Sequence, residues 1–395
     1  MQPFDTHNRT RIIFGEGKID CLGKVASDFR PVSVLVVSDR GIREAGHHDR
    51  AVRALEKEGI KVRCFHEFSE NPTSAMVDAG VQVAAEVKPD LLVGIGGGSS
   101  MDCCKAINFV YCCGGSIHDY HGTGKATSDL LPMIAIPTTA GTGSEAQSYA
   151  LISDAETHIK MACGDARAAA KVAILDPQLT ITQPELVTAL TGIDAISHSI
   201  ETHVSTRRNA VSTTYSRRAF GMLANSFERV LNEPEDIEAR SMMQLGAYYA
   251  GLAIENSMLG AAHATANPMT ARHNITHGQA VGVMLPAVVN MNGQQCSREY
   301  AELIREIDPS TAEEEATERL RTQILCWLEK ADLATSIHAL KITPDSLQPL
   351  VAEALQQWTG NFNPLPLDEE NVQALYCAAI SNTFPDLTKT NVRSI

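Results

Sequence analysis

The sequence has 395 residues, of which 44% are hydrophobic and 20% charged, and its formal net charge is −14. This length exceeds the size at which one hydrophobic core usually divides, so we expect two domains. The acidic balance argues against binding to nucleic-acid phosphates or anionic lipid as the main activity. There is no apolar run of the length that spans a bilayer and no signal-peptide core, so we expect a cytoplasmic protein.

The first part of the chain, residues 1–182, alternates short β-rich runs with stretches of helical periodicity. Strands are predicted at 33–39, 61–68, 90–98 and 131–139, and helices at 42–59, 74–88 and 100–113. Strands that alternate with helices are typical of βαβ units, so a mainly parallel sheet is expected.

The character of the sequence changes near residue 180, after which strand-like runs nearly vanish. Helices are predicted at 184–205, 210–231, 236–258 and 311–333. No tract rich in Gly, Ser or Pro marks the change, so a flexible linker is not expected. We therefore expect an α/β domain over 1–182 and an all-helical domain over 183–395, packed around a cleft.

Ten cysteines are present, among them the adjacent pairs Cys103–Cys104 and Cys112–Cys113. They show no CxxC or Cys/His spacing of a zinc site. Small buried hydrophobic side chains on a packed helix are the first interpretation, and oxidation-sensitive surface thiols are the second. A disulfide scaffold is not expected in a long chain without a secretion signal.

The stretch GIGGGSSMD, residues 94–102, follows a predicted strand and opens a predicted helix. Consecutive glycines let the backbone approach a ligand, and the free N–H groups of a helix N-terminus suit a pyrophosphate. A second loop, 136–147, places Thr138, Thr139 and Thr142 around two glycines after another strand. A tight turn without a ligand is the alternative, but two such loops at one sheet edge indicate a ligand crevice.

Asp39 ends the strand predicted at 33–39. A carboxylate at this place can accept both hydroxyls of an adenosine ribose and would repel a 2′-phosphate, so it favours NAD over NADP. The alternative is an Asp that only caps the next helix. Because Asp39 precedes the glycine turn, the topology differs from the usual dinucleotide fold, in which the acidic residue follows the turn.

Asp194 and His198 lie one helical turn apart and therefore on one face of the predicted helix. Further along, His263, His273 and His277 lie within fifteen residues. One carboxylate and three imidazoles form a ligand set suited to Fe(II) or Zn(II). The alternatives are a hydrogen-bonded Asp–His pair and histidines that are only packed in the core.

Four motifs in this order, GGGSSMDCCKAI, IPTTAGTGSE, TGIDAISHSIE and HATANPMTARHNITHG, resemble the iron-containing alcohol dehydrogenase family. The resemblance covers nearly the whole chain. It implies an N-terminal nucleotide-binding domain, a C-terminal helical domain with the metal between them, and an architecture like that of dehydroquinate synthase. It also implies metal binding by Asp194, His198, His263 and His277.

The same resemblance implies a set of residues that bind NAD. It places the pyrophosphate at Gly97, Gly98 and Ser99 with Asp102 nearby, the cofactor against Thr138, Thr139 and Thr142, Lys160 at the nicotinamide ribose, and Asp39 and Asn71 at the adenosine end. The implied reaction is hydride transfer between NAD(H) and a small alcohol or aldehyde, with Fe(II) first and Zn(II) second as the metal. A homo-oligomer, specifically a dimer, is also expected.

The sequence departs from the family pattern at Asn267, where members often carry a second histidine with a role in proton movement. Asn cannot titrate, so the proton would move through water, the nicotinamide ribose hydroxyl or His273. Two enzymatic alternatives share the scaffold, namely a polyol dehydrogenase and a hydroxyacid–oxoacid transhydrogenase. A third alternative is a catalytically impaired NAD-binding protein.

Overall fold

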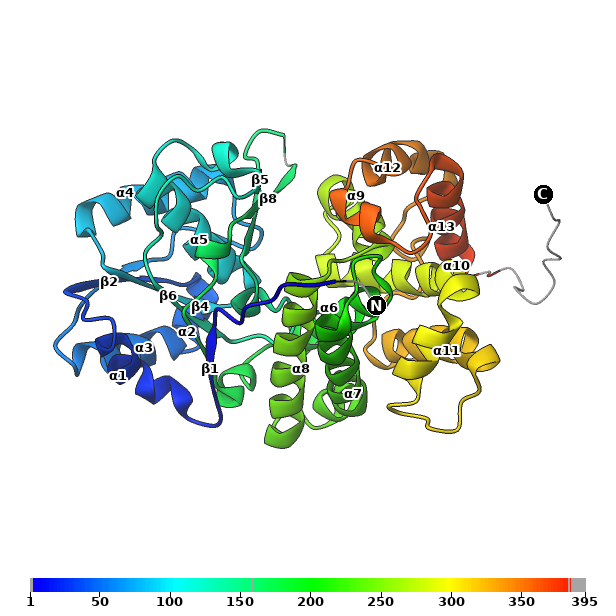
Figure 1. Ribbon diagram of the computed structural model, residues 1–395, viewed down its shortest axis with the longest axis horizontal. Helices are drawn as coiled ribbons and strands as arrows, with labels where there is room; N and C mark the ends of the chain where they lie inside the picture. The colour runs from blue at the N-terminus through cyan, green and yellow to red at the C-terminus, as the bar shows by residue number, and fades with distance from the viewer. Residues whose placement is uncertain (1–2, 158, 383, 385–395) are drawn as a thin grey trace.

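The computed structural model describes residues 3–157, 159–382 and 384. Figure 1 shows two lobes side by side, a sheet-containing lobe built from the first half of the chain and a helical lobe built from the second. The last strand ends at Leu175, and the first long helix of the helical lobe begins at Glu185. The predicted fold class, an α/β part followed by a helical part, is confirmed.

A six-stranded sheet, in which every pairing is parallel, forms the centre of the first lobe. Its spatial order is β1 (Arg11–Phe14), β9 (Val172–Leu175), β6 (Met133–Pro137), β4 (Leu91–Gly96), β2 (Ser33–Val37) and β3 (Lys61–Phe65). Strands β4 and β6, which precede the two glycine-containing loops, are direct neighbours in this order. Both loops consequently leave the same edge of the sheet.

Helices cover both faces of this sheet, and strand periodicity decides which residues meet them. Val34 and Val36 of β2 pack on one face with α1 (Leu22–Ser27) and α3 (His47–Glu56). The alternate residue Leu35 packs on the other face. That second face is covered by α4 (Ser74–Val87) and α5 (Gly98–Cys113).

The helix predicted over 42–59 is wrong as a single element. The structure has two helices there, α2 (Arg40–Glu44) and α3. Gly46 lies between them with a φ of 80°, a conformation that glycine adopts without steric cost and that an α-helix cannot include. The apolar periodicity of the stretch therefore continues through a residue at which the helix is interrupted.

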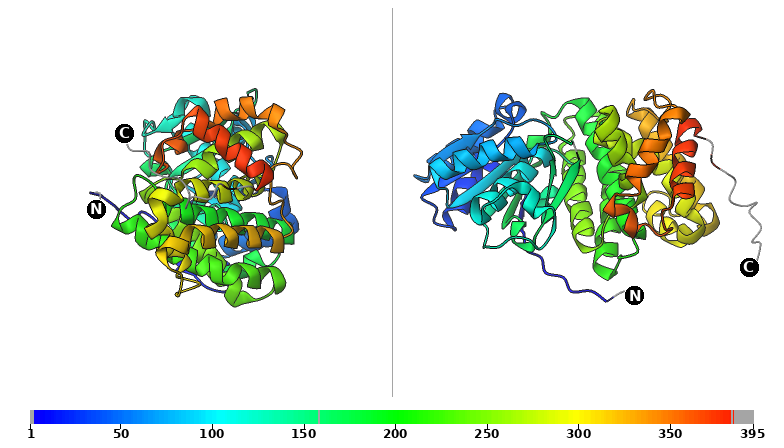
Figure 2. Two further views of the ribbon diagram at one scale, coloured as in Figure 1. Left: turned by 90° about the vertical axis from the view of Figure 1, so that its right-hand side faces the viewer. Right: turned by 90° about the horizontal axis from the view of Figure 1, so that it is seen from above.

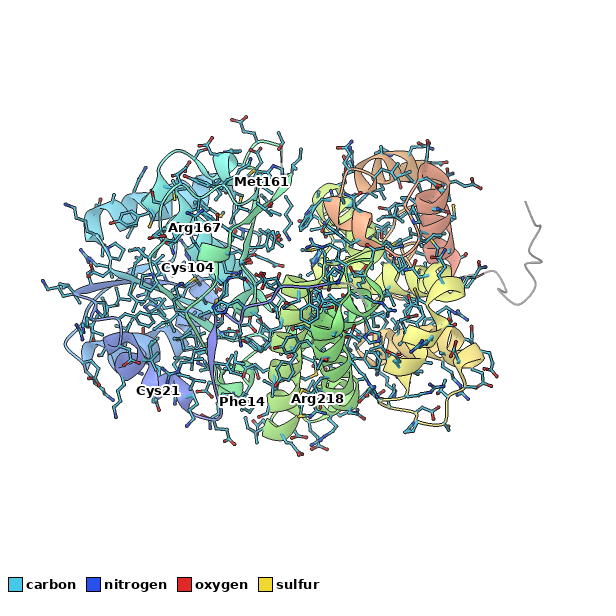
Figure 3. The ribbon with its side chains drawn as sticks, viewed as in Figure 1. Phe14, Cys21, Cys104, Met161, Arg167 and Arg218 are labelled. Carbon is cyan, nitrogen blue, oxygen red and sulfur yellow. The ribbon has the colours of Figure 1, made fainter. Side chains whose placement is uncertain are left out.

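A small second sheet, absent from the sequence-based predictions, lies beside α5. It joins β5 (Gly122–Thr123), β8 (Lys160–Gly164) and β7 (Tyr149–Ser153), with β7 and β8 antiparallel. The cysteines of α5 are partly as expected, since Cys103 and Cys104 (the latter labelled in Figure 3) are fully buried, while Cys112 and Cys113 are half-buried. All ten cysteines are free.

The helical lobe surrounds one large apolar core. Its helices are α6 (Glu185–Val204), α7 (Ala210–Asn232), α8 (Ile237–Asn256), α9 (Ala261–His273), α10 (His277–Ile304), α11 (Ala316–Lys330), α12 (Leu347–Ala354) and α13 (Glu369–Ser381). Among the described residues, no helix combines the length and the apolarity needed to cross a membrane.

The N-terminal segment crosses from the sheet lobe to the helical lobe, as Figure 1 and the right-hand view of Figure 2 show. Thr6 donates to Asn256 at 2.6 Å, and Arg9 pairs with Glu255 at 3.4 Å, both at the end of α8. Glu255 also accepts from the backbone N–H of Ser148 at 3.0 Å. These contacts hold α8 against the sheet lobe.

Candidate active site

Four predicted metal ligands converge at the inner side of the helical lobe. The Oδ1 atom of Asp194 lies 3.3 Å from Nε2 of His198, 3.5 Å from Nε2 of His263 and 3.8 Å from Nε2 of His277. The Nε2 atoms of His198 and His263 are 3.1 Å apart. The structure thus places three imidazole nitrogens within 3.8 Å of one carboxylate oxygen.

Three helices supply this cluster, which is buried except for half-buried His277. Asp194 and His198 come from α6, His263 from α9 and His277 from the first position of α10. Gly278 permits the close approach of α10, because a Cβ there would lie 2.3 Å from the carbonyl oxygen of Leu190. That contact sets His277 against α6 one turn before Asp194.

Glu201, which the sequence analysis does not select, orients one of these imidazoles. Its Oε2 accepts a hydrogen bond from Nδ1 of His263 at 2.5 Å, and its Oε1 accepts from the backbone N–H of Ala262 at 2.7 Å. Nδ1 of His263 therefore carries a proton, and Nε2 is the ring nitrogen that faces Asp194. The signal in the sequence is a buried carboxylate one turn after His198, on the same helix.

The charges inside the cluster are strongly coupled. Burial lowers the pKa of His263, but the Glu201 and Asp194 carboxylates outweigh burial and raise that pKa to about 9. Burial lowers the pKa of His277 to about 3 and also lowers the pKa of His198. Burial opposes ionisation of Asp194, yet the surrounding imidazoles bring its pKa well below the usual value.

A cation fits this arrangement. Among the described residues, the buried Asp194 Oδ1 faces three imidazole Nε2 atoms and accepts no hydrogen bond in bonding geometry. Asp194, His263 and His277 offer ligand atoms that all lie within 4.8 Å of one another. Lone pairs that face each other in a buried space are unfavourable unless a positive charge lies between them.

His203, a further histidine of α6, lies outside the cluster. Its buried ring bonds through Nδ1 to Ser216 Oγ at 2.9 Å, and its Nε2 faces Glu302 at 3.3 Å. The helical rotation that separates it from Asp194 accounts for this position.

The two glycine-containing loops pack directly against each other at the edge of the main sheet. A Cβ on Gly98 would lie 2.7 Å from Cγ2 of Thr142, and a Cβ on Gly97 would lie 3.3 Å from Cγ2 of Thr139. Thr138 is buried, with its N–H donated to the Gly96 carbonyl at 2.9 Å. The first turn of α5 begins at Gly97 without a side-chain cap, so its N–H groups face this edge.

Residues predicted at the adenosine end surround the same turn. Ser99 Oγ accepts from the backbone N–H of Asn71 at 3.3 Å. Asp39 accepts from Ser100 Oγ at 3.1 Å and caps α2 by accepting from Ile42 N–H at 3.1 Å. The cap that we considered as an alternative is therefore present, together with a link from Asp39 to the glycine turn.

A buried ionic network fixes the second loop to α5. Ser144 Oγ donates to Asp102 at 2.6 Å, and the Nζ of Lys105 donates to Ser144 Oγ at 2.9 Å and to the Tyr149 carbonyl at 2.8 Å. Burial raises the pKa of Asp102 and lowers the pKa of Lys105. In each case the charge of the partner shifts the pKa in the opposite direction. Lys105 is a further residue that the sequence analysis does not select.

Lys160 of β8 lies between the two groups of residues. Burial lowers its pKa, while the carboxylates of both Asp102 and Asp194 act in the opposite direction. Lys160 therefore lies within electrostatic reach of Asp102, beside the two glycine-containing loops, and of Asp194 in the four-residue cluster.

Asn267 and His273, the residues discussed for proton movement, differ in exposure. Asn267 follows His263 by one turn, is half-buried and donates through Nδ2 to Gln357 at 2.9 Å. His273 is exposed at the end of α9, which favours the alternative of a surface histidine. Next to Gln357, Trp358 stacks on Tyr149 of the sheet lobe with ring centroids 5.8 Å apart.

Comparison with known proteins gives matches over nearly the whole chain. Residues 9–177 match the family model for iron-containing alcohol dehydrogenase, and residues 188–380 match the model for the C-terminal part of that family. Choline dehydrogenase from Bacillus subtilis is 31% identical, covering 95% of each chain. Alcohol dehydrogenase 4 from Schizosaccharomyces pombe is 30% identical, covering 93% of this chain and 87% of the relative.

Solved structures agree with this assignment. A 1,3-propanediol oxidoreductase superposes with a TM-score of 0.93 at 27% identity, over 96% of this chain and all of the other. Sulfoacetaldehyde reductase from Bifidobacterium kashiwanohense, solved in complex with NAD+, gives a TM-score of 0.86 at 25% identity, over 97% of this chain and all of the other. On its sequence, its fold and the composition of its buried cluster, the chain belongs to the iron-containing alcohol dehydrogenase family.

Proposed function

We propose that the protein transfers a hydride between NAD(H) and a small alcohol or its aldehyde with the help of one divalent metal ion. The observation that carries the proposal is the convergence of Asp194 Oδ1 with three imidazole Nε2 atoms. A carboxylate with three imidazoles suits Fe(II), which we propose as the metal, with Zn(II) as the alternative. A bound cation supplies Lewis-acid stabilisation of charge on the substrate oxygen, which favours ionisation of an alcohol.

The residues of the cluster would hold the metal, and Glu201 would hold His263. Because Glu201 accepts the Nδ1 hydrogen bond of His263, the Nε2 atom is oriented toward the ligand position before any ion binds. Such preorganisation lowers the reorganisation that binding requires.

The loops of the sheet lobe would hold NAD. The uncapped start of α5 supports a pyrophosphate at Gly97, Gly98 and Ser99, since helix N-termini favour anions. The half-buried carboxylate of Asp39 supports NAD rather than NADP. Lys160, placed between Asp102 and Asp194, supports a contact with the nicotinamide ribose.

The substrate that we propose is a small hydroxylated molecule. Relatives of this chain are named for choline, methanol and 1,3-propanediol. A panel that includes these three, simple straight-chain alcohols and the matching aldehydes, each with NAD and NADP, tests the substrate class and the cofactor preference together.

Metal analysis of anaerobically purified protein tests the site. We expect one equivalent of Fe or Zn at this cluster and a turnover of NADH with aldehydes that a chelator abolishes. His198→Ala should lose the metal equivalent and the turnover. His203→Asn, which changes a buried histidine on the same helix, should keep them. Full metal content and activity in His198→Ala would contradict the proposal.

The same assays separate the alternatives. A polyol dehydrogenase would prefer diols in the panel, and a transhydrogenase would exchange hydride between two substrates without releasing NADH. A catalytically impaired protein would bind NADH, with no turnover of any substrate.

For the proton we propose a route that avoids position 267. The Asn267 amide does not titrate and is held by Gln357, so the proton would leave through water, the nicotinamide ribose hydroxyl or His273. Exposure of His273 favours the first two routes. His273→Ala should therefore leave turnover and its pH profile unchanged in steady-state assays, and a shifted pH profile would assign the role to His273.

A further inference from the structure

A second group of side chains of types that can bind a metal lies in the sheet lobe, on elements other than those of the four-residue cluster. It consists of His48, Cys64 and His66, whose ligand atoms all lie within 4.8 Å of one another. His48 is the second residue of α3, while Cys64 belongs to β3 and His66 follows directly after that strand. We refer to these three residues as the thiol–imidazole cluster.

Strand geometry explains why the three meet. Cys64 and His66 are alternate residues, so both side chains point to the same face of the sheet. The residue Cys64 packs with the apolar residues that α3 covers, and α3 carries His48. Because β3 is an edge strand of the main sheet, Cys64 and His66 remain half-buried and accessible to an ion, whereas His48 is buried.

Ser38, at the end of neighbouring β2, orients both imidazoles. Its Oγ lies 2.9 Å from Nδ1 of His48 and 3.1 Å from Nδ1 of His66. The Nδ1 of His66 also lies 2.8 Å from the Ser38 carbonyl, an acceptor to which it must donate. The Nε2 atom of His66 then carries a lone pair, and an N–H donated to a backbone carbonyl is the usual second interaction of a metal-bound histidine.

The protonation states are compatible with ion binding. Burial lowers the pKa of His48 to about 4, so its ring is neutral at pH 7, and Nε2 carries the lone pair when Nδ1–H donates to Ser38 Oγ. Burial raises the pKa of Cys64 to about 11, so the thiol keeps its proton until a cation replaces it. Binding would release that proton to solvent and form a thiolate bond.

We propose that the thiol–imidazole cluster is a second metal site, which takes a Zn(II)-class ion through one thiolate and two imidazoles with a fourth position open to water. This ligand set suits Zn(II) and Co(II), and it differs from the oxygen-containing set around Asp194. In a tetrahedral zinc site the ligand atoms are roughly 3.3–3.8 Å apart, so small side-chain rotations would close the group around the ion. The site rests on geometry that is independent of the proposed catalytic function.

Titration of metal-free, reduced, full-length protein with Co(II) tests the proposal. A thiolate ligand gives a near-ultraviolet sulfur-to-cobalt charge-transfer band, which the four-residue cluster around Asp194 cannot give because it contains no sulfur. We expect this band in the wild-type protein, together with a second equivalent of bound Co(II) per chain.

Variants assign the band to residues. Cys64→Ser and His66→Asn should lose the band and one equivalent of Co(II) but keep the other, which shows that the protein is folded. His198→Ala should do the reverse. Cys21→Ser, which changes another half-buried cysteine at the start of α1 (Figure 3), should leave both equivalents in place.

Two results would overturn the proposal. The first is a wild-type protein that binds one Co(II) and shows no charge-transfer band, in which case the Ser38 contacts form a structural hydrogen-bond network only. The second is a band that persists in Cys64→Ser, which would assign the thiolate to a different cysteine.

Discussion

The two lobes build their parts of the candidate site in different ways. In the sheet lobe, neighbouring parallel strands β4 and β6 deliver two loops to one edge, so backbone topology alone brings the loops together. In the helical lobe, side chains from three helices must converge on one point, and Asp194 meets His277 only because α10 approaches α6 at Gly278. Strand order therefore fixes the first half of the site, whereas side-chain packing fixes the second.

The largest expected effect comes from removing the negative charge of the helical half. Asp194→Asn keeps the shape of the side chain but removes the carboxylate ligand, so the metal equivalent at this cluster and the turnover should be lost. NADH affinity, measured by calorimetry, should stay near the wild-type value because the loops are in the other lobe. A parallel loss of NADH binding would show that the two halves are not separable.

A pH effect on stability should come from the sheet lobe. Burial raises the pKa of Glu145 in the second loop to about 7, above its usual 4.5. A carboxyl group with a raised folded pKa contributes stability below pH 4.5 that is lost as the pH rises through 7, on the order of 3 kcal/mol. Urea unfolding from pH 4.5 to 8 should show this loss in the wild type, and Glu145→Gln should flatten it; an equally steep variant curve would contradict the assignment.

The next effect concerns the orientation of a single ligand. Glu201→Gln keeps a hydrogen bond to His263 but removes the charge, and we expect metal affinity to fall by roughly 10–100-fold in competition with a chelator. Glu302→Gln is the matched control, because Glu302 faces His203 outside the cluster. Equal losses in both variants would point to general destabilisation of the lobe.

The smallest effect tests the contact between the two loops. Gly98→Ala adds a Cβ 2.7 Å from Cγ2 of Thr142, an overpacking worth about 1–3 kcal/mol. NADH binding should weaken by about tenfold while metal content is unchanged. Adding Thr142→Ser removes the opposing methyl group and should restore part of the affinity, and no recovery would mean that the loops do not act through this contact.

The parts that the sequence predicts well are those that depend on topology. The parallel sheet follows from alternating strands and helices, and the adjacency of the two loops follows from strands of one sheet. The interruption of the helix at Gly46 is missed because the apolar spacing continues through it, although the helical conformation does not. The hairpin of β7 and β8 is missed because its short strands lie among loop sequences.

The helical half was harder to derive from the residues alone. One turn of helix places Asp194 and His198 on one face, but periodicity does not say which other helix faces them. The family resemblance selects His263 and His277 from three candidate histidines. Glu201 and Lys105 escape notice because each acts through a partner distant in the sequence, His263 and Ser144 respectively. Such partnerships become visible only when the helices are packed.

The stack of Trp358 on Tyr149 gives the protein an internal optical probe. The chain contains two tryptophans, and Trp327 is buried within the helical lobe, in contact with Phe220 and Phe227. Trp358 instead rests on an aromatic ring of the opposite lobe. Its fluorescence should therefore report changes in the angle between the lobes when cofactor enters, while Trp327 provides a constant background.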